Sequence, residues 1–301
     1  MTFLNRLKAT QQLDRIVIDE CHVVLNDQTD FRGQLQKLGR LMAAETQMVL
    51  LTATLPPTKE RELWKRMGCV EDEVVMIRAA TCRKNIAYKV VDIGSRASQK
   101  GQDEVISRLV NKALQETEKG KVVIYCNSIK RVEQLAGSGL FCSEGFHRRL
   151  GEGRKREVLQ DFMAGMTRVV VATSALGMGV NIPDIRLVLH VDEPRNLMDY
   201  GQESGRAGRD GLKSEAVIVK GIELGEGEGE GLMKRYLDGQ NKECRRIVMG
   251  EFLDGDSSRV GCLEDKENCD RCNRERRRRV VSDESPVLQD PGEQEPDSGS
   301  P

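Results

Sequence analysis

The chain has 301 residues, of which 38% are hydrophobic and 32% are charged, an ordinary composition for an intracellular globular protein of more than one domain. Its 47 basic and 48 acidic residues leave a net charge of −1, so nucleic-acid binding must come from local patches and not from the overall field. No apolar run approaches the roughly 18 residues of a membrane span, and the N-terminus lacks a signal-peptide pattern. We therefore expect a nuclear or cytoplasmic protein with no membrane partner.

The first predicted element is a short apolar strand that ends in two adjacent carboxylates. Residues 13–18 are rich in β-branched side chains, and Asp19 and Glu20 follow directly. The run is typical of a buried parallel strand, and ligands of open α/β sheets lie at the carboxyl ends of such strands. Nucleotide-bound Mg²⁺ takes one or two carboxylates, and a neighbouring acid can orient an attacking water. A plain loop start is the alternative for this segment alone.

A second strand of the same kind is predicted over residues 47–51. It runs into Thr52 and Thr54 and stops before the pair Pro56 and Pro57. Proline has no backbone N–H to continue a strand. Two hydroxyl groups at a strand end can relay between sites, so we treat the two threonines as candidate coupling residues.

The middle of the chain predicts one complete α/β lobe. Strands are expected near residues 122–126, 169–172, 187–191 and 216–219, with helices at 129–136 and 154–163. This alternation predicts a parallel sheet covered by helices on both faces. Within it, His190 is best explained as a core histidine with satisfied polar atoms. For His147, a place in a functional loop and a structural role are equally good interpretations.

The sequence QESGRAGRDG, from Gln202 to Gly211, places two guanidinium groups three residues apart between glycines. Arg206 and Arg209 stay charged at physiological pH, and their planar forks suit the oxygens of a phosphoryl group. The pair can therefore reach one phosphate. Taken alone, the segment is equally well explained as a polar helix start with solvated arginines.

The composition shifts after residue 221. Residues 225–231 alternate glycine and glutamate, and both glycine entropy and like-charge repulsion oppose packing, which indicates a flexible linker. Helices are expected at 233–237 and 243–252. The cysteines then concentrate, and the C-x-x-C spacing among them is typical of a zinc site, with chance clustering as the alternative. The four clustered cysteines are Cys244, Cys262, Cys269 and Cys272.

A basic run at residues 274–279 precedes an acidic end rich in proline, serine and glycine. Such a run can bind a phosphate backbone or act as a nuclear address. A solvated, disordered tail explains it equally well.

In their order along the chain, the motifs DECH (19–22), TAT (52–54) and QESGRAGRDG closely resemble those of superfamily 2 helicases, and specifically the RecQ family. Residues 122–128 and 169–186 resemble motifs IV and V of that family, and the ordered set is far more specific than any single motif. The resemblance covers about residues 13–275. It implies an α/β fold with two RecA-like parallel-sheet lobes, the first partial and the second complete, then a helical four-cysteine zinc-binding subdomain and a disordered tail. The expected boundaries are 1–80, 81–222, 223–232 (linker), 233–275 and 276–301.

The resemblance also implies an ATP-dependent 3′-to-5′ DNA helicase that uses ATP, Mg²⁺ and Zn²⁺ and binds single-stranded or forked DNA. Asp19 would hold the metal ion, Glu20 would activate water, and Gln202 would sense the nucleotide. Arg206 and Arg209 would contact the γ-phosphate, with Arg209 as the arginine finger. Coupling or DNA contact would fall to His22, Thr52, Thr54, Asn127, Ser128, Thr173 and Ser174. Zinc would be held by Cys244, Cys262, Cys269 and Cys272.

Three features depart from the family pattern. No phosphate loop of the form G-x-x-x-x-G-K-[ST] precedes the DECH motif, and such a loop holds the β and γ phosphates. Residues 23–32 contain no tryptophan and one aromatic where the family has an aromatic-rich loop. Ile182 stands where the family usually has a lysine.

We therefore expect the chain to start inside the first lobe and not to hydrolyse ATP unaided. The missing part of that lobe would have to come from elsewhere, for example in trans. Two further hypotheses are a catalytically inactive DNA- or protein-binding remnant, and a degenerate gene copy or wrongly predicted start.

Overall fold

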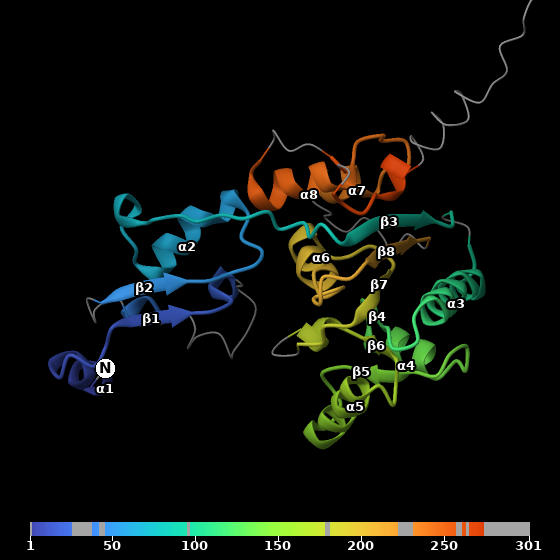
Figure 1. Ribbon diagram of the computed structural model, residues 1–301, viewed down its shortest axis with the longest axis horizontal. Coiled ribbons are helices and arrows are strands. Elements are labelled where there is room, and N and C mark those ends of the chain that lie inside the picture. Colours follow the sequence, from blue (N-terminus) through green and yellow to red (C-terminus); the bar gives the residue numbers. More distant parts are fainter. Residues whose placement is uncertain are drawn as a thin grey trace, which may run out of the picture.

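The computed structural model describes residues 2–25, 38–41, 46–94, 97–177, 181–221, 231–256, 261–262 and 265–273. These residues form two α/β parts, each with its own parallel sheet, and a helical region beside them (Figure 1). The predicted tail at 276–301 and most of the predicted linker at 223–232 lie outside the described residues.

The N-terminal lobe is built on a two-stranded parallel sheet. Strand β1 (Arg15–Ile18) pairs with β2 (Gln47–Leu50), with Ile18 opposite Leu50. A small core joins the sheet to the segments η1 (Cys21–Leu25) and α2 (Glu60–Met67). The remaining segments of this lobe are α1 (Thr2–Ala9), η3 (Pro57–Lys59) and η4 (Glu71–Glu73).

The expectation that β1 is buried is wrong, although its parallel pairing is confirmed. Alternate positions of the strand face solvent, and Val17 is 53% exposed. Within the described residues β1 has one neighbouring strand, and the core lies on the side of Ile18. An apolar run therefore shows that a strand can be buried, but not that both of its faces are covered.

The second lobe contains a six-stranded, all-parallel sheet in the order β3-β8-β7-β4-β6-β5. All four predicted strands are confirmed to within two residues at each end, while β3 and β5 were not predicted. The strands are β3 (Ile86–Asp92), β4 (Lys121–Cys126), β5 (Glu144–Phe146), β6 (Val169–Ala172), β7 (Ile185–Val191) and β8 (Ser214–Lys220).

Helices cover both faces of this sheet, as predicted (Figure 1). Successive side chains of a strand point to opposite faces, so Val122 and Ile124 of β4 join one core, and Val123 and Tyr125 join the other. The first core includes α3 (Gln99–Glu116) and α4 (Ile129–Ala136). The second includes α5 (Glu152–Ala164), α6 (Leu197–Ser204), α7 (Gly231–Leu237) and α8 (Arg245–Asp254).

Helix α6 begins at a defined cap. The side chain of Asn196 accepts a hydrogen bond from the backbone N–H of Asp199 at 2.7 Å, which satisfies one of the free donors of the first turn. Because α6 leads directly into residues 202–211, this cap positions the two arginines that follow.

The packing of α5 against the second core leads to a prediction about stability. Phe162 of α5 is fully buried, whereas its neighbour Met163 is exposed. Phe162→Ala should lower the free energy of unfolding by about 3–5 kcal/mol through lost apolar burial and a residual cavity. Met163→Ala should change it by less than about 0.5 kcal/mol. Urea denaturation followed by circular dichroism measures both, and equal losses would contradict the assigned packing of α5.

Candidate functional site

His22 joins the two lobes through its ring. The imidazole is buried, with Nδ1 2.9 Å from Thr52 Oγ1 and Nε2 2.6 Å from Nε2 of Gln202 on α6. An amide nitrogen is a donor, so Nε2 of the ring must accept and Nδ1 carries the proton, directed at the threonine hydroxyl. The contact links the strand ends of the first lobe to the helix that carries the arginine segment.

The two predicted acids lie at the carboxyl end of β1. The backbone N–H of Glu20 donates to Asp19 Oδ1 at 2.8 Å, and Glu20 Oε2 lies 3.4 Å from His22 Nδ1. Glu20 has φ +52°, a left-handed conformation that costs a non-glycine residue about 1–2 kcal/mol. Its side chain is exposed, so the carboxylate is open to a hydrated cation.

Arg206 and Arg209 follow α6 and line one hollow of the second lobe. The other lining residues are apolar: Val123, Leu176, Ile182 and Ile185. Burial, with the nearby charges of Arg206 and Arg83, lowers the pKa of Arg209, and the charge of Glu20 acts in the opposite direction. The concentration of guanidinium groups favours an anion there.

The turn between these arginines requires glycine at one position. Gly208 has φ +56°, and a Cβ at this position would lie 2.5 Å from Asn85 Nδ2 and 2.5 Å from Ser214 Oγ. Arg83 Nη2 donates to the carbonyl of Gly208 at 2.9 Å. The close approach of these groups fixes the path of the chain from Arg206 to Arg209.

Four more predicted site residues gather at the carboxyl ends of β4 and β6. Asn127 Nδ2 donates to the carbonyl of Glu193 at 2.8 Å, and Ser128 caps α4 by accepting from the N–H of Arg131 at 3.2 Å. The backbone N–H of Thr173 donates to Phe146 at 3.1 Å. Ser174 and Asn127 line a shared hollow.

Thr54 lies behind α6 rather than in the open cleft. It is 1% exposed, its backbone N–H donates to Thr52 Oγ1 at 3.3 Å, and its Cγ2 lies 3.5 Å from where a Cβ of Gly201 would be. Its hydroxyl oxygen has no hydrogen-bond partner within the described residues, and a coupling role for Thr54 stays a prediction.

The expectation for His190 is wrong in part. The residue is buried and its Nε2 lies 2.9 Å from Glu203 Oε2, but Nδ1 has no partner within the described part of the chain. Its ring stacks on Tyr125 at 5.3 Å, so aromatic packing, which no periodicity reveals, explains its position. His147 is buried with its Nε2 3.5 Å from Glu133.

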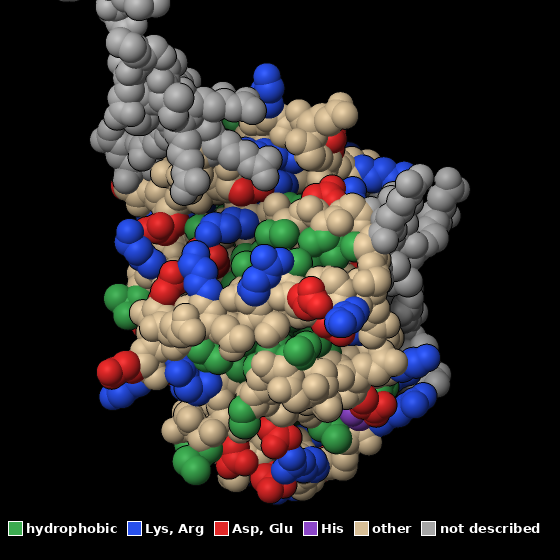
Figure 2. All heavy atoms as spheres, turned by 90° about the vertical axis from the view of Figure 1, so that its right-hand side faces the viewer, with side chains coloured by type: hydrophobic (Ala, Val, Ile, Leu, Met, Phe, Trp, Pro, Cys, Tyr) green, Lys and Arg blue, Asp and Glu red, His purple; other side chains and the backbone are tan. Residues whose placement is uncertain are grey.

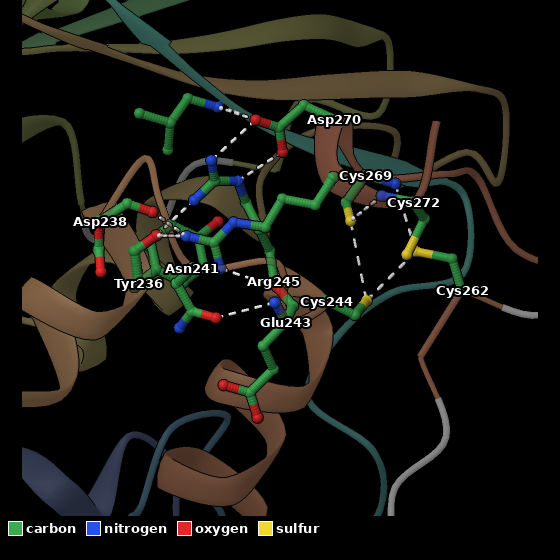
Figure 3. A network of polar contacts seen from close by, with 12 residues as sticks. Tyr236, Asp238, Asn241, Glu243, Cys244, Arg245, Cys262, Cys269, Asp270 and Cys272 are labelled. Carbon is green, nitrogen blue, oxygen red and sulfur yellow. Dashed lines mark hydrogen bonds and ion pairs between the residues drawn. The ribbon is translucent and has the colours of Figure 1, made fainter. Parts of the chain in front are cut away.

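The four predicted cysteines meet at one point, as Figure 3 shows. Their sulfur atoms all lie within 4.8 Å of one another, with Cys244 Sγ 3.6 Å from Cys262 and 3.8 Å from Cys269. A tetrahedral zinc ion with Zn–S bonds of about 2.3 Å separates sulfurs by about 3.8 Å. The backbone N–H of Cys269 also points at Cys262 Sγ, at 3.2 Å. The donor set and its spacing fit Zn²⁺.

A framework of buried arginines, missed from the sequence, surrounds this cluster. Arg245 Nη2 pairs with Asp270 Oδ2 at 2.8 Å, and Arg271 Nη2 donates to the carbonyls of Tyr236 at 3.0 Å and Asp238 at 2.6 Å (Figure 3). Arg246 donates to the carbonyl of Arg83 at 2.7 Å. In the sequence, the only indication of this arginine framework is that its members lie beside Cys244, Cys269 and Cys272.

Figure 2 shows one face of the molecule, the right-hand side of Figure 1, with basic and acidic side chains interspersed. Among the side chains coloured there, neither sign of charge dominates, in keeping with the net charge of −1. Among the described residues, no helix combines the length and apolar character needed to cross a membrane.

The chain matches two helicase domain families and several curated helicases. Residues 1–63 match "DEAD/DEAH box helicase" and residues 103–211 match "Helicase conserved C-terminal domain". The chain is 29% identical over 280 residues to ATP-dependent DNA helicase RecQ of Pasteurella multocida, covering 85% of this chain and 41% of that protein. The chain is 30% identical over 280 residues to the RecQ protein of Haemophilus influenzae, covering 85% of this chain and 42% of that protein. The chain thus spans about two fifths of the length of these relatives.

Solved structures show the same fold. The Saccharomyces cerevisiae protein Dbp5 bound to RNA and ADP BeF3 aligns with a TM-score of 0.62 at 17% identity, covering 93% of this chain and 66% of that one. Mss116p bound to single-stranded RNA and AMP-PNP aligns with a TM-score of 0.56 at 16% identity, covering 84% of this chain and 53% of that one. The predicted α/β fold with RecA-like lobes is confirmed.

The environment of His22 predicts a pH dependence. Burial lowers the pKa of His22 below its usual 6.5, against the smaller opposing effects of Glu20, Asp199 and Asp19. The unfolded chain therefore binds more protons than the native state, so His22 contributes stability above pH 6.5 that is lost as the pH falls towards the folded pKa. Titration of the three histidine ring signals by NMR, assigned with His22→Asn, should show His22 titrating below 6.5. A pKa at or above 6.5 would contradict the buried ring.

The cysteine cluster predicts one bound zinc ion per chain. Cys269→Ser should abolish stoichiometric zinc and lower the thermal midpoint, because metal-binding free energy is folding free energy. Cys142→Ser is the matched control, since Cys142 is exposed and lies outside the cluster. Elemental analysis of the purified variants measures the content. Loss of zinc from both variants, or from neither, would contradict the assignment of the four cysteines as a zinc site.

Proposed function

The chain belongs to the RecQ family of superfamily 2 helicases, and from this premise we propose that it provides the catalytic cleft and the zinc-binding subdomain of an ATP-dependent 3′-to-5′ DNA helicase. The hydrogen bond between His22 and Gln202 carries the proposal. It joins the segment that follows the acids of β1 to the helix that precedes the two arginines, which supports the proposal that these groups line opposite walls of one nucleotide-binding cleft. The proposed domain boundaries are 1–80, 81–222 and 233–275, with the linker and tail between and after them.

In the proposed reaction, Glu20 orients a water molecule and takes its proton as the water oxygen bonds to the γ-phosphorus. The bond from that phosphorus to the ADP oxygen breaks. Asp19 holds Mg²⁺, which neutralises phosphate charge when bound. Arg206 and Arg209 stabilise the charge of the transferred group, a contribution that is large when an arginine is placed in this position.

DNA is proposed to lie along the carboxyl ends of β4 and β6, where Asn127, Ser128, Thr173 and Ser174 gather. His22, Thr52 and Thr54 are proposed to connect this edge to the nucleotide through the contacts of His22 and Thr54 with α6. A change in the cleft would thereby alter the grip on single-stranded or forked DNA. A nuclear location is part of the same proposal, because the action is on DNA.

The 301 residues contain no phosphate loop, and such a loop holds the β and γ phosphates of a nucleotide. We propose that turnover requires a further polypeptide segment that carries this loop, supplied in trans or otherwise. The specific observation that the loop is absent also favours the second candidate function. In that alternative, the complete second lobe and the zinc subdomain bind DNA or a protein partner without turnover.

Single-stranded-DNA-stimulated phosphate release by the 301-residue chain tests the proposal, with Glu20→Gln as a control that keeps the shape and removes the activating carboxylate. We expect no turnover above the control, and binding to single-stranded DNA that weakens as salt increases, because phosphate contacts release counterions.

Each other outcome is informative. Turnover that disappears in Glu20→Gln would contradict the need for an added loop and support the roles of the acids. Absence of both turnover and DNA binding would contradict the helicase function and the DNA-binding alternative together.

A further inference from the structure

The C-terminal end of α8 contacts parts of the molecule that are far apart in the sequence. Leu253 is fully buried, and its Cδ1 lies 2.9 Å from where a Cβ of Gly201 on α6 would be. Pro57 of the first lobe lies 2.6 Å from the corresponding position on Gly255. The end of α8 therefore packs between α6 and the segment that follows Thr54.

Arg78 ties this end of the helix to the first lobe. Its Nη1 donates to the carbonyl of Leu55 and to the carbonyl of Leu253, each at 2.8 Å, and its Nη2 pairs with Glu60. Arg78 belongs to the segment between η4 and β3 that connects the lobes. A planar guanidinium holds several acceptors in a fixed geometry, which a flexible ammonium does not.

Asp254, the last residue of α8, also binds the segment that connects the lobes. Its carboxylate accepts the backbone N–H of Thr81, with Oδ1 at 3.1 Å and Oδ2 at 3.2 Å, and also the hydroxyl of Thr81. Asp254 is 9% exposed, so these bonds are shielded from solvent. Arg78 and Thr81 are thus both held by the last residues of α8.

The opposite end of α8 begins at the cysteine cluster. Cys244 is the N-cap residue of the helix, and the next residues, Arg245 and Arg246, belong to the buried arginine framework. A ten-residue helix is about 15 Å long, and Figure 1 shows α8 lying from the side of β3 towards the lobe of α2. One rigid element therefore joins the metal centre to the segment between the lobes.

We propose that α8 is a hinge clamp, defined by Arg78, Thr81, Leu253 and Asp254, through which the zinc-binding subdomain fixes the orientation of the two lobes. Arg78 and Asp254 are positioning residues for the His22–Gln202 contact, and they touch neither nucleotide nor DNA. The clamp deepens the proposed function, because the step that it regulates is the closure of the two lobes. It rests on the proposed function in this respect alone.

Hydrogen exchange followed by mass spectrometry tests the clamp in the zinc-loaded 301-residue chain. Arg78→Ala and Asp254→Ala should each raise exchange about tenfold in residues 76–83 and in the cleft segments 21–25 and 197–204, the scale of one lost buried charge-assisted hydrogen bond. Exchange in α2 (60–67) should stay parental, because the first lobe keeps its core. Arg61→Ala is the matched control, since Arg61 is exposed and its nearest acid, Glu71, lies 3.6 Å away on the surface.

Removal of the metal adds a second arm. Chelation of the parent chain should raise exchange in the same cleft segments, whereas in the Arg78→Ala/Asp254→Ala double variant it should leave them within about twofold of the loaded state, because the connection is already broken. The clamp is overturned if the single variants change residues 76–83 alone, or if chelation affects the cleft of the double variant as strongly as that of the parent.

A second variant of Asp254 covers the case in which alanine also loosens α2. Asp254→Leu keeps a similar side-chain shape and removes both acceptor oxygens, and parental cleft exchange in this variant would overturn the clamp. Raised cleft exchange with α2 unchanged would support it. None of these measurements needs nucleotide or DNA, so a chain without ATPase activity leaves the test of the clamp intact.

Discussion

The contact of His22 with Gln202 is the interaction on which the rest of the candidate site depends. An unpaired ring nitrogen of a buried imidazole costs free energy, so partners for both nitrogens of His22 stabilise its position. Here the partners come from different lobes: Thr52 from the first and Gln202 from the second. The two lobes are thus joined by the burial of one side chain. The same contact relates the acids that end β1 to the arginines that follow α6, because Gln202 lies in the helix that leads to them.

Local patterns in the sequence predict those parts of this molecule in which neighbours along the chain decide the structure. The β-branched run at 122–126 becomes a central strand, the capping serine Ser128 starts the next helix, and the C-x-x-C pair meets two earlier cysteines. Other features depend on residues far apart in the chain. Arg78 and Leu253 are 175 positions apart, and no spacing rule connects them. The solvent-facing side of β1 and the unpaired Nδ1 of His190 likewise depend on what packs nearby.

Charge is used differently in two parts of the molecule. Arg206 and Arg209 line a hollow whose other lining residues are apolar, and two guanidinium groups there favour an anion. Around the cysteine cluster, Arg245 and Arg271 donate hydrogen bonds to carboxylate and carbonyl oxygens of the same region. Such bonds remove the need for an extensive apolar core in a short segment, since buried donors then find acceptors. The same residue type thus lines a hollow in the second lobe and stabilises the region around the cysteine cluster.

The crowded backbone at Gly208 has a consequence for inherited variation. Asn85, Ser214 and the carbonyl of Leu212 all lie within 2.6 Å of the position that a Cβ would take. Any missense change at this codon forces the loop to move, and the arginines on either side move with it. Such an allele would retain every charged side chain of the cleft and still lose the spacing between them, so its phenotype would match that of an arginine replacement.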